Sequence, residues 1–470
     1  MKTCKRLLAL AIALSSVLTV TGCGKADDSS SSSHVDQVEV QDTSLVDSMD
    51  EELTEEDRTI RWMGTYDLNP TGNSETSVEM SLFQEKGGKV EWIRVTDSAK
   101  FDKLAAAITS QQNVPDIFKY EWMAFPCQVT KNMYQPIDSI VDFESDIWSD
   151  VKQGADKFVL NGEHYVAPIS YSVGVLMMYD KDVIDAEGLD DPYELYLEDN
   201  WNWDTWRAIM DDYVAGSTAD VKRYGVAGWF APQVIQQTGE TLVKYEDGVF
   251  KSNLLNPDIE RAETFIYDLT KDGLVYSDWV DNAKTCLGSM DNILFYVMGT
   301  WAMTGNNGPE EGDNWAVVPI PADPNTNAKI TTSDMTAYMW VAGSEKDQAV
   351  KTWMECAHIA ATKEEYKEAG KQKFLIDNPQ WTEEMYDVIQ DTSSSNYEHV
   401  FDYAYGISAL LSDDNSSEDG SCVTRKLYEY VTKTDADGTQ YTWSELRSSY
   451  STVMDDELNK INATISAMTK

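Results

Sequence analysis

The fold of this chain is decided by one stretch, Gly162-Glu-His-Tyr-Val-Ala-Pro-Ile-Ser-Tyr-Ser-Val-Gly-Val-Leu-Met-Met-Tyr-Asp-Lys-Asp182. Most of its residues are apolar, β-branched or aromatic, which is typical of buried extended backbone. Proline cannot donate a hydrogen bond to a strand ladder, so we expect the extended segment to be broken at Pro168. The stretch therefore predicts a long, buried, interrupted strand.

Outward from this stretch toward the N-terminus, short apolar runs alternate with amphipathic stretches from Thr59 onward. Such alternation indicates an α/β domain with a doubly wound sheet, whose ligands lie at the carboxyl ends of its strands. The predicted elements are, in order, a strand at 60–64, a helix at 77–86 ended by Gly87-Gly88, a strand at 90–95, a helix at 101–112 and a strand from Pro115.

The central stretch resembles the segment of family 1 extracellular solute-binding proteins, the maltose-binding-protein-like components of sugar importers, in which a strand passes between two lobes. Other landmarks agree with that family in order and spacing: Pro115 to Phe118, Tyr224-Gly-Val-Ala-Gly-Trp-Phe230, Met298-Gly-Thr-Trp-Ala-Met303 and Asn314-Trp-Ala-Val-Val-Pro-Ile-Pro321. The resemblance runs from Thr59 to the helix around 346–362, and the remainder matches only as a generic helical tail.

The resemblance implies an α/β, two-lobed, type II periplasmic-binding-protein-like fold. Each lobe would be a doubly wound sheet flanked by helices, with the ligand cleft between the lobes and closure on binding. On this basis we expect the first lobe at 59–167 plus 335–375 and the second at 168–334 plus 376–470.

The N-terminus carries a secretory signal. Lys2, Lys5 and Arg6 precede an apolar run from Leu7 to Val20, which is shorter than the roughly 20 residues that span a bilayer. The run ends in Leu18-Thr-Val-Thr-Gly-Cys23, which resembles the lipobox of bacterial lipoproteins. We therefore expect a signal peptide at 1–22, lipidation of Cys23, and a disordered tether of serine and acidic residues at 23–58.

Composition excludes some functions and leaves others open. A formal net charge of −44 at pH 7 disfavours nucleic-acid binding, which needs clustered lysine and arginine. Cys127, Cys286, Cys356 and Cys422 have no metal-ligand spacing and allow three disulfide pairings, among which the sequence does not choose. The Asp413–Gly420 and Asp435–Gly438 stretches do not fit a calcium loop, so we expect no metal site and no cofactor.

Sugars have apolar C–H faces and rings of hydroxyls, so a sugar cleft needs aromatic platforms and hydrogen-bonding side chains. The chain has 15 tryptophans and 24 tyrosines. Trp301 is the best candidate, because Gly299-Thr300-Trp301 resembles the family segment that carries a sugar-stacking tryptophan; core packing is the alternative. Further candidates follow expected strand ends: Trp229, Phe230, Trp122, Glu121, Tyr66, Asp67 and Asn69.

The remaining candidates have two interpretations each. Tyr171 and Ser172 reach either the cleft or the hinge. Asn306 offers an amide to hydroxyls or belongs to a plain turn in Gly305-Asn-Asn-Gly308. Trp201, Trp203 and Trp206 are left out, since the resemblance implies a lobe surface for them.

The sequence thus predicts a lipid-anchored solute-binding protein on the outer face of the bacterial cytoplasmic membrane. It would be a monomer that delivers a carbohydrate, in particular an oligosaccharide, to the permease subunits of an ABC-type importer. A short-peptide carrier is the alternative, followed by a secreted glycan-active enzyme. Catalysis is disfavoured because no acidic pair lies in a catalytic motif and no nucleophile elbow, P-loop or zincin motif appears.

Overall fold

The computed structural model describes residues 53–70, 76–290, 292–326, 328–413 and 420–468. The expected signal peptide, Cys23 and most of the expected tether lie outside these residues, as does most of the Asp413–Gly420 stretch. The first described residues lie against the folded body, since the Leu53 N–H donates to the Lys86 carbonyl at 3.0 Å.

The first lobe is built on a six-stranded sheet with the order β14-β13-β3-β1-β2, in which β6 also pairs with β13. Its central strand β1 is parallel to β2 and β3, while β13 is antiparallel to β3. The strands are β1 (Thr59–Gly64), β2 (Lys89–Arg94), β3 (Ile117–Lys119), β6 (Ala167–Val173), β13 (Ile330–Trp340) and β14 (Glu398–Val400). Its helices are α2 (Val78–Glu85), α3 (Lys100–Ser110), α4 (Lys152–Ala155) and α11 (Asp347–Thr362).

These elements confirm the predicted strand and helix order, with ends shifted by one or two residues. Helix α2 begins after Ser77 and ends at Lys86, before Gly87, whose φ of 81° continues no helix. Helix α3 ends at Gln111 in the left-handed conformation. Local end signals of this kind are readable from sequence because they depend on neighbouring residues only.

The second lobe is built on a four-stranded sheet with the order β12-β7-β11-β8. Strand β7 is antiparallel to β11 and β12, and β8 is parallel to β11. The strands are β7 (Val175–Asp180), β8 (Tyr224–Gly228), β11 (Ile293–Gly299) and β12 (Trp315–Val318). The helices are α5 (Lys181–Glu187), α6 (Pro192–Leu197), α7 (Trp203–Ala215), α8 (Phe230–Gln236), α9 (Pro257–Lys271) and α10 (Ala283–Ser289).

Trp201, Trp203 and Trp206 are core residues of this lobe and not surface residues. They are 5%, 2% and 0% exposed. Asn202 caps α7 with a capping box that includes Thr205, and this cap turns the flanking indoles inward. The expectation of a lobe surface was wrong because it rested on resemblance and not on this local geometry.

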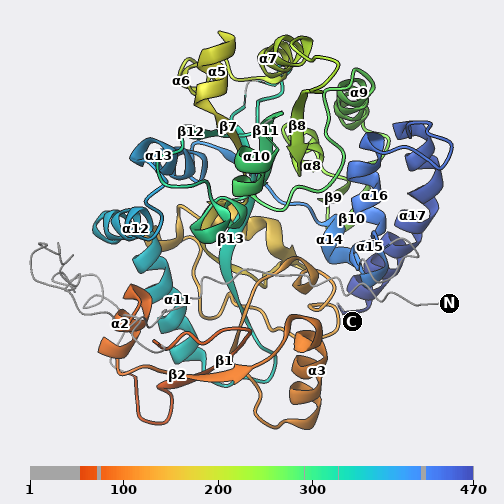
Figure 1. Ribbon diagram of the computed structural model, residues 1–470. Coiled ribbons are helices and arrows are strands. Elements are labelled where there is room, and N and C mark those ends of the chain that lie inside the picture. The colour runs from red at the N-terminus through yellow and green to blue at the C-terminus, as the bar shows by residue number, and fades with distance from the viewer. Residues whose placement is uncertain (1–52, 71–75, 291, 327, 414–419, 469–470) are drawn as a thin grey trace, which may run out of the picture.

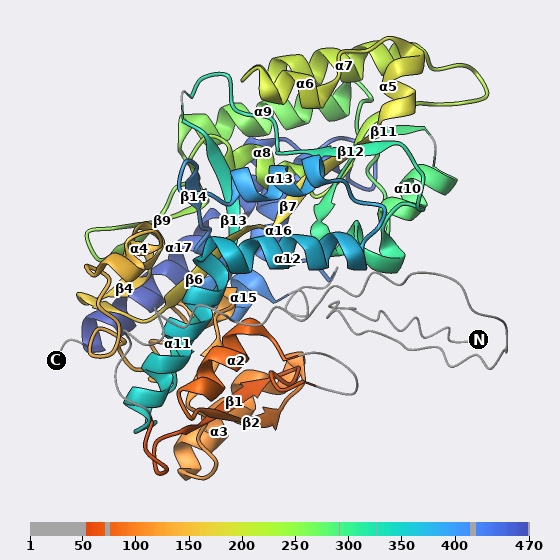
Figure 2. The ribbon, with the colours of Figure 1, turned by 90° about the vertical axis from the view of Figure 1, so that its left-hand side faces the viewer.

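The chain passes from the first sheet to the second at Gly174, between β6 and β7. The extended segment is not broken at Pro168, which lies within β6. Ser170 and Pro168 pair with the consecutive residues Thr336 and Ala337 of β13, so Ile169 is the extra residue of a bulge in β6 itself. A bulge is one of the places where a strand accommodates proline. The chain returns to the first lobe along β13, which runs between the two lobes (Figures 1 and 2).

The C-terminal part is a set of helices that contacts both lobes. Helix α17 packs against β10 and α9, and α14 lies against the loop after β3. Figure 1 shows α14 to α17 beside β9 and β10, and α12 and α13 on the other side of the molecule. The elements are α12 (Glu364–Asp377), α13 (Glu383–Thr392), α14 (Ala404–Ile407), α15 (Ala409–Ser412), α16 (Val423–Glu429), α17 (Trp443–Met468), β9 (Val243–Glu246) and β10 (Val249–Ser252).

Short elements complete the description: the hairpin of β4 (Val159–Leu160) and β5 (Glu163–His164), and the 3-10 helices η1 (Asp97–Ala99), η2 (Trp122–Ala124), η3 (Asp146–Trp148), η4 (Asp156–Phe158), η5 (Thr300–Ala302), η6 (Gly305–Asn307) and η8 (Tyr430–Thr432). Within the ranges that the structure describes, no helix has the length and apolar character to cross a membrane. Cys127, Cys286, Cys356 and Cys422 are all buried, and no disulfide joins them in the part of the chain that the structure describes.

Candidate functional site

The carboxyl ends of β8 and β11 lie next to the crossing between the lobes. Gly299, the last residue of β11, pairs with Val175 immediately after Gly174. Asp334 of β13 pairs with Ser172, and a Cβ placed on Gly174 would lie 3.5 Å from the Cβ of Asp334. The Tyr120 N–H, just after β3, donates to Ala337, three residues along β13 from Asp334. At about 3.3 Å per strand residue, strand ends of both lobes therefore lie within roughly 10 Å of each other along β13.

Trp301 lies at the second-lobe side of this crossing, in η5 directly after β11. It is 37% exposed. Its ring lies 6.4 Å from that of Trp229 at 70°, and the Trp229 ring lies 6.2 Å from that of Trp279 at 59°. A Cβ on Gly299 would meet the Trp301 indole at 2.4 Å, so glycine is needed where the ring folds over the strand end. We call Trp229, Trp279 and Trp301 the tryptophan cluster.

Trp279 belongs to this cluster although sequence reasoning missed it. It is 52% exposed, and its Nε1 donates to the Asp281 carboxylate at 2.8 Å. It lies in the loop between α9 and α10. Neither the strand-end argument for Trp229 nor the family resemblance for Trp301 therefore applied to it.

Phe230 is placed in the core. It is 2% exposed, and its ring lies 6.2 Å from that of Trp206. Trp229 precedes α8, and Phe230 is the first residue of that helix. The side chain of Phe230 therefore points into the core, although that of its neighbour Trp229 does not. Asn306 lies exposed in η6, three residues beyond η5.

On the first-lobe side, Trp122 and Glu121 follow β3. Trp122 is 54% exposed and its ring lies 4.8 Å from that of Tyr405 at 34°. Glu121 forms an ion pair with Lys100. Burial raises the pKa of Glu121, and the neighbouring Lys100 ammonium opposes that rise.

Tyr66, Asp67 and Asn69 form a half-buried loop after β1. The Asp67 carboxylate accepts hydrogen bonds from the Asn69 N–H at 3.0 Å and its side-chain amide at 2.9 Å. The same amide donates to the Val90 carbonyl at 3.1 Å. The Tyr66 ring lies 5.6 Å from that of Trp62, and burial raises the Tyr66 pKa. The polar groups of Asp67 and Asn69 thus stabilise the loop itself.

Tyr171 packs within the first lobe near the crossing. Its hydroxyl accepts from the Gly154 N–H at 2.8 Å and donates to the Val151 carbonyl at 3.1 Å. Its ring stacks on that of His399 at 4.0 Å. These contacts favour the hinge interpretation of Tyr171, whereas Ser172 lies opposite Asp334 at the crossing.

The segment around α14 brings further polar groups close to Tyr120 and Trp122 that the sequence analysis did not identify. The Asp402 carboxylate accepts from the Tyr428 hydroxyl at 2.7 Å and the Ala404 N–H at 2.9 Å. Asp402, Tyr405 and Tyr120 all keep some solvent access, yet burial raises the pKa of Asp402 to about 6 and that of Tyr120 well above its usual range.

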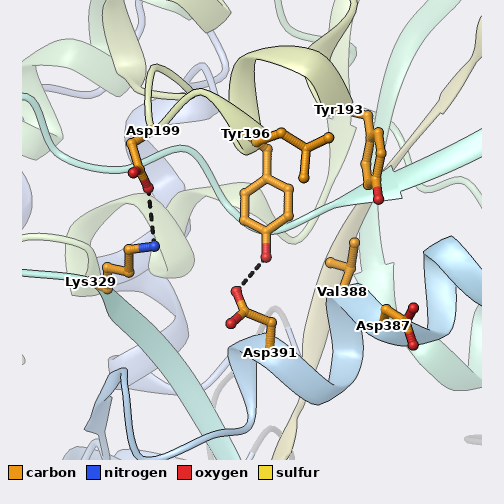
Figure 3. Close-up of a pocket in the computed structure, with 8 residues that line it drawn as sticks. Tyr193, Tyr196, Asp199, Lys329, Asp387, Val388 and Asp391 are labelled. Carbon is orange, nitrogen blue, oxygen red and sulfur yellow. Dashed lines mark hydrogen bonds and ion pairs between the residues drawn. The ribbon is translucent and has the colours of Figure 1, made fainter.

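A separate pocket of about 350 Å³ lies between α6 and α13 (Figure 3). Its charged groups are paired with their neighbours: Lys329 lies 3.0 Å from the Asp199 carboxylate, and the Tyr196 hydroxyl donates to Asp391 at 2.5 Å. The pocket takes no residue from the strand ends at the crossing, so we do not include it in the cleft. Over the described ranges, no group of three or more histidine, cysteine, aspartate or glutamate side chains is arranged to hold a metal ion.

Residues 81–376 match the family model of the bacterial extracellular solute-binding proteins. The chain belongs to this family. The match confirms the resemblance seen in the sequence, and it identifies a family of binding proteins and not of enzymes. It ends before Asp402 and Tyr405, so the C-terminal wall of the cleft lies outside the matched residues.

Solved structures of other solute-binding proteins confirm the two-lobed α/β fold. The galacto-N-biose/lacto-N-biose I-binding protein from Bifidobacterium longum is 13% identical with a TM-score of 0.59, over 88% of this chain and 99% of that one. The sugar-binding protein MalE from Xanthomonas citri is 14% identical with a TM-score of 0.55, over 87% and 98%. A transporter-associated binding protein from B. animalis subsp. lactis Bl-04, solved with β-1,6-galactobiose, is 17% identical with a TM-score of 0.54, over 86% and 98%. No curated protein sequence matches the chain.

Proposed function

We propose that this solute-binding protein captures a carbohydrate, in particular an oligosaccharide, in the cleft between its lobes and delivers it to the permease subunits of an ABC-type importer. The observation that carries the proposal is the pairing of exposed aromatic rings with polar groups on both sides of the crossing. The tryptophan cluster supplies apolar platforms on the second lobe, and Trp122 supplies one on the first. Asp334 and Asp402 supply acceptors for sugar hydroxyls.

The comparisons support this choice of solute. The proteins from B. longum and B. animalis that share the fold were solved with lacto-N-biose and β-1,6-galactobiose. A solute bound by both lobes stabilises the closed state, because only that state makes both sets of contacts. Closure would then present the surface that the permease recognises.

The proposal includes a location and an anchor. The protein would lie on the outer face of the cytoplasmic membrane, held by lipid on Cys23, and act as a monomer. The predicted signal sequence and the lipobox-like segment ending at Cys23 support the location and the anchor. The division into two lobes stays part of this proposal, with the first crossing at Gly174 in place of Pro168, because β6 pairs with β13 in the first sheet. Mass spectrometry of the membrane-extracted protein tests the anchor, since lipidation adds the mass of the acyl chains to Cys23.

The test of the solute is a thermal-shift screen of the purified chain against neutral mono- and oligosaccharides, with amino acids and short peptides as comparators. A ligand that binds only the folded state raises the melting temperature according to its concentration relative to Kd. We expect one class of glycan to raise the melting temperature of the protein. Trp301→Ala should weaken the binding of that glycan by about tenfold or more, which corresponds to a loss of roughly 1.4 kcal/mol of binding free energy.

Leu255→Ala is the matched control, because Leu255 is an exposed apolar side chain, 80% accessible, outside the cleft. This substitution should leave the rise in melting temperature caused by the glycan unchanged. A shift with peptides alone would replace the carbohydrate proposal with a peptide carrier. Glycan breakdown during the incubation would contradict the assignment as a binding protein.

A further inference from the structure

Asp334 and Trp301 lie close together at the crossing between the lobes, although Asp334 belongs to β13 and Trp301 follows β11. A Cβ on Gly174 would lie 3.5 Å from the Cβ of Asp334. A Cβ on Gly299 would meet the Trp301 indole at 2.4 Å and the Gly174 carbonyl oxygen at 3.4 Å. Both side chains therefore lie beside Gly174, where the chain passes from one sheet to the other.

The Asp334 carboxylate is exposed and has no cationic partner. It accepts a hydrogen bond of 2.8 Å from the N–H of the next residue, Met335. In the part of the chain that the structure describes, no lysine or arginine forms an ion pair with this carboxylate. Hydrogen bonds between two charged groups are shorter and stronger than those between neutral groups. The ligand group that suits Asp334 best is therefore a positively charged hydrogen-bond donor.

Further carboxylates lie near Asp334, around the hydroxyl of Tyr120. Burial raises the pKa of Tyr120 well above its usual range. The negative charges of Asp334, Asp402 and Glu121 lie close enough to raise that pKa further. Glu121 is paired with Lys100, whereas the described residues that hydrogen-bond to Asp402 are two uncharged donors. Two carboxylates near the crossing are therefore without a counter-charge from the described residues.

The exposed indole of Trp301 suits the same kind of ligand group. The negative face of an aromatic ring attracts an ammonium group within about 6 Å of the ring centre, and tryptophan has the strongest such interaction. The same face also packs against the apolar C–H face of a sugar ring. An exposed indole beside an unpaired carboxylate therefore matches a sugar ring that carries an ammonium group.

We propose that the solute is an amino sugar, or an oligosaccharide that contains one, and that Asp334 binds its ammonium group beside the Trp301 ring. Asp402 adds negative charge near this group. The proposal rests on the carbohydrate function proposed above and names the class of carbohydrate. A neutral sugar of the same shape leaves the Asp334 carboxylate without a counter-charge and therefore binds more weakly.

The test is isothermal titration calorimetry on the full chain. The probes are glucosamine, galactosamine and their oligomers, each compared with two neutral counterparts in which a hydroxyl or an acetamido group replaces the amine. We expect the best-bound amino sugar to bind about tenfold or more tightly than its hydroxyl counterpart. This preference should decrease as salt is added, because salt screens the attraction between exposed charges.

Asp334→Asn separates the effect of the charge from that of the shape of the site. It should remove most of the preference for the amine and leave the affinity for the hydroxyl counterpart within about twofold of the wild-type value. Glu198→Gln is the matched control, because Glu198 is an exposed acidic side chain at the end of α6. It should leave both affinities unchanged.

Two results would overturn the ammonium site while leaving the carbohydrate function intact. One is equal or weaker binding of the amino sugar relative to its hydroxyl counterpart. The other is an unchanged preference for the amine in Asp334→Asn. Binding of spermidine or of short peptides, with no binding of any sugar, would instead contradict the carbohydrate function and the amino-sugar proposal with it.

Discussion

Glu263 illustrates how a single residue can oppose the stability of this molecule. It lies on the inner face of α9, is 0% exposed, and neither carboxyl oxygen has a hydrogen-bond partner. Burial raises the pKa of Glu263 well above its usual range. An unpaired polar group in the core costs free energy whether it is protonated or ionised.

We expect Glu263→Leu to raise the free energy of unfolding by roughly 1 to 3 kcal/mol at pH 7, the usual cost of an unsatisfied buried polar group. Urea unfolding followed by circular dichroism measures this difference. Glu198→Gln is the control, because Glu198 is exposed, and it should change stability by less than about 0.5 kcal/mol. A less stable Glu263→Leu would mean that the carboxyl group has a stabilising partner.

The pH dependence of the free energy of unfolding provides a second test of Glu263. Because the folded-state pKa of Glu263 is raised, the unfolded chain releases its proton at lower pH than the folded chain. The free energy of unfolding of the wild-type chain, relative to Glu263→Leu, is therefore highest below the unfolded-state pKa of Glu263. It falls as the pH rises toward the folded-state pKa. The gain from Glu263→Leu should accordingly grow between pH 4 and pH 7.

Sequence reasoning reached some cleft residues and not others for reasons visible at single positions. Trp229 became a candidate because it follows an apolar strand, and Trp301 because its segment resembles the family segment with a sugar-stacking tryptophan; the structure brings the two rings together. Phe230, next to Trp229, is in the core because the helix start reverses its direction, and that reversal depends on backbone angles that the pattern does not encode. Tyr405 and Asp402 were missed because only tertiary contact brings them to Trp122.

At the scale of elements, the approach of α14 to η2 depends on Gly406. We expect Gly406→Ala to destabilise the protein by roughly 1 to 3 kcal/mol, since its methyl group would overlap the Phe125 carbonyl and force the elements apart. Thermal unfolding measures the effect, and near-ultraviolet circular dichroism reports the loss of the Trp122–Tyr405 ring contact.

Gly370→Ala is the matched control for that substitution. Gly370 lies within α12, and a Cβ there would meet nothing within 4 Å. The change should stabilise the chain by about 0.5 to 1 kcal/mol, because alanine restricts the unfolded backbone and favours the helix. Equal effects of the two substitutions would show that α14 is not interlocked with η2.

Among the elements, those with strong local signals were predicted well. The strands and helices between Thr59 and Lys119 appear where apolar periodicity and glycine placed them. Pro168 was misjudged because β6 continues through it, with a bulge at the neighbouring Ile169 that only the pairing with β13 reveals. The arrangement of α14 to α17 was not predicted beyond its helical character, since helix packing depends on surfaces contributed by both lobes.

At the scale of the whole molecule, the two sheets share one continuous hydrophobic core. One cluster of buried residues includes Phe118 and Phe125 of the first lobe together with Phe230 and Phe250 of the second. Two further clusters lie within single lobes. Because the shared cluster joins the lobes, neither can lose its packing without exposing the other.

We therefore expect the chain to unfold in one cooperative transition despite its two lobes. Differential scanning calorimetry should give a van't Hoff enthalpy close to the calorimetric enthalpy. Phe125→Ala, which removes a ring between the lobes, should broaden or split the transition. Two resolved transitions in the wild-type chain would show that the shared core does not couple the lobes.

The four buried free thiols have a consequence for how the protein is made. Cys127, Cys286, Cys356 and Cys422 are each no more than 6% exposed, so the finished body offers oxidants little access to them. Folding of that body does not depend on an oxidoreductase or on the correct pairing of half-cystines. A chain that folds under reducing conditions should therefore reach the same conformation as one that folds under oxidising conditions.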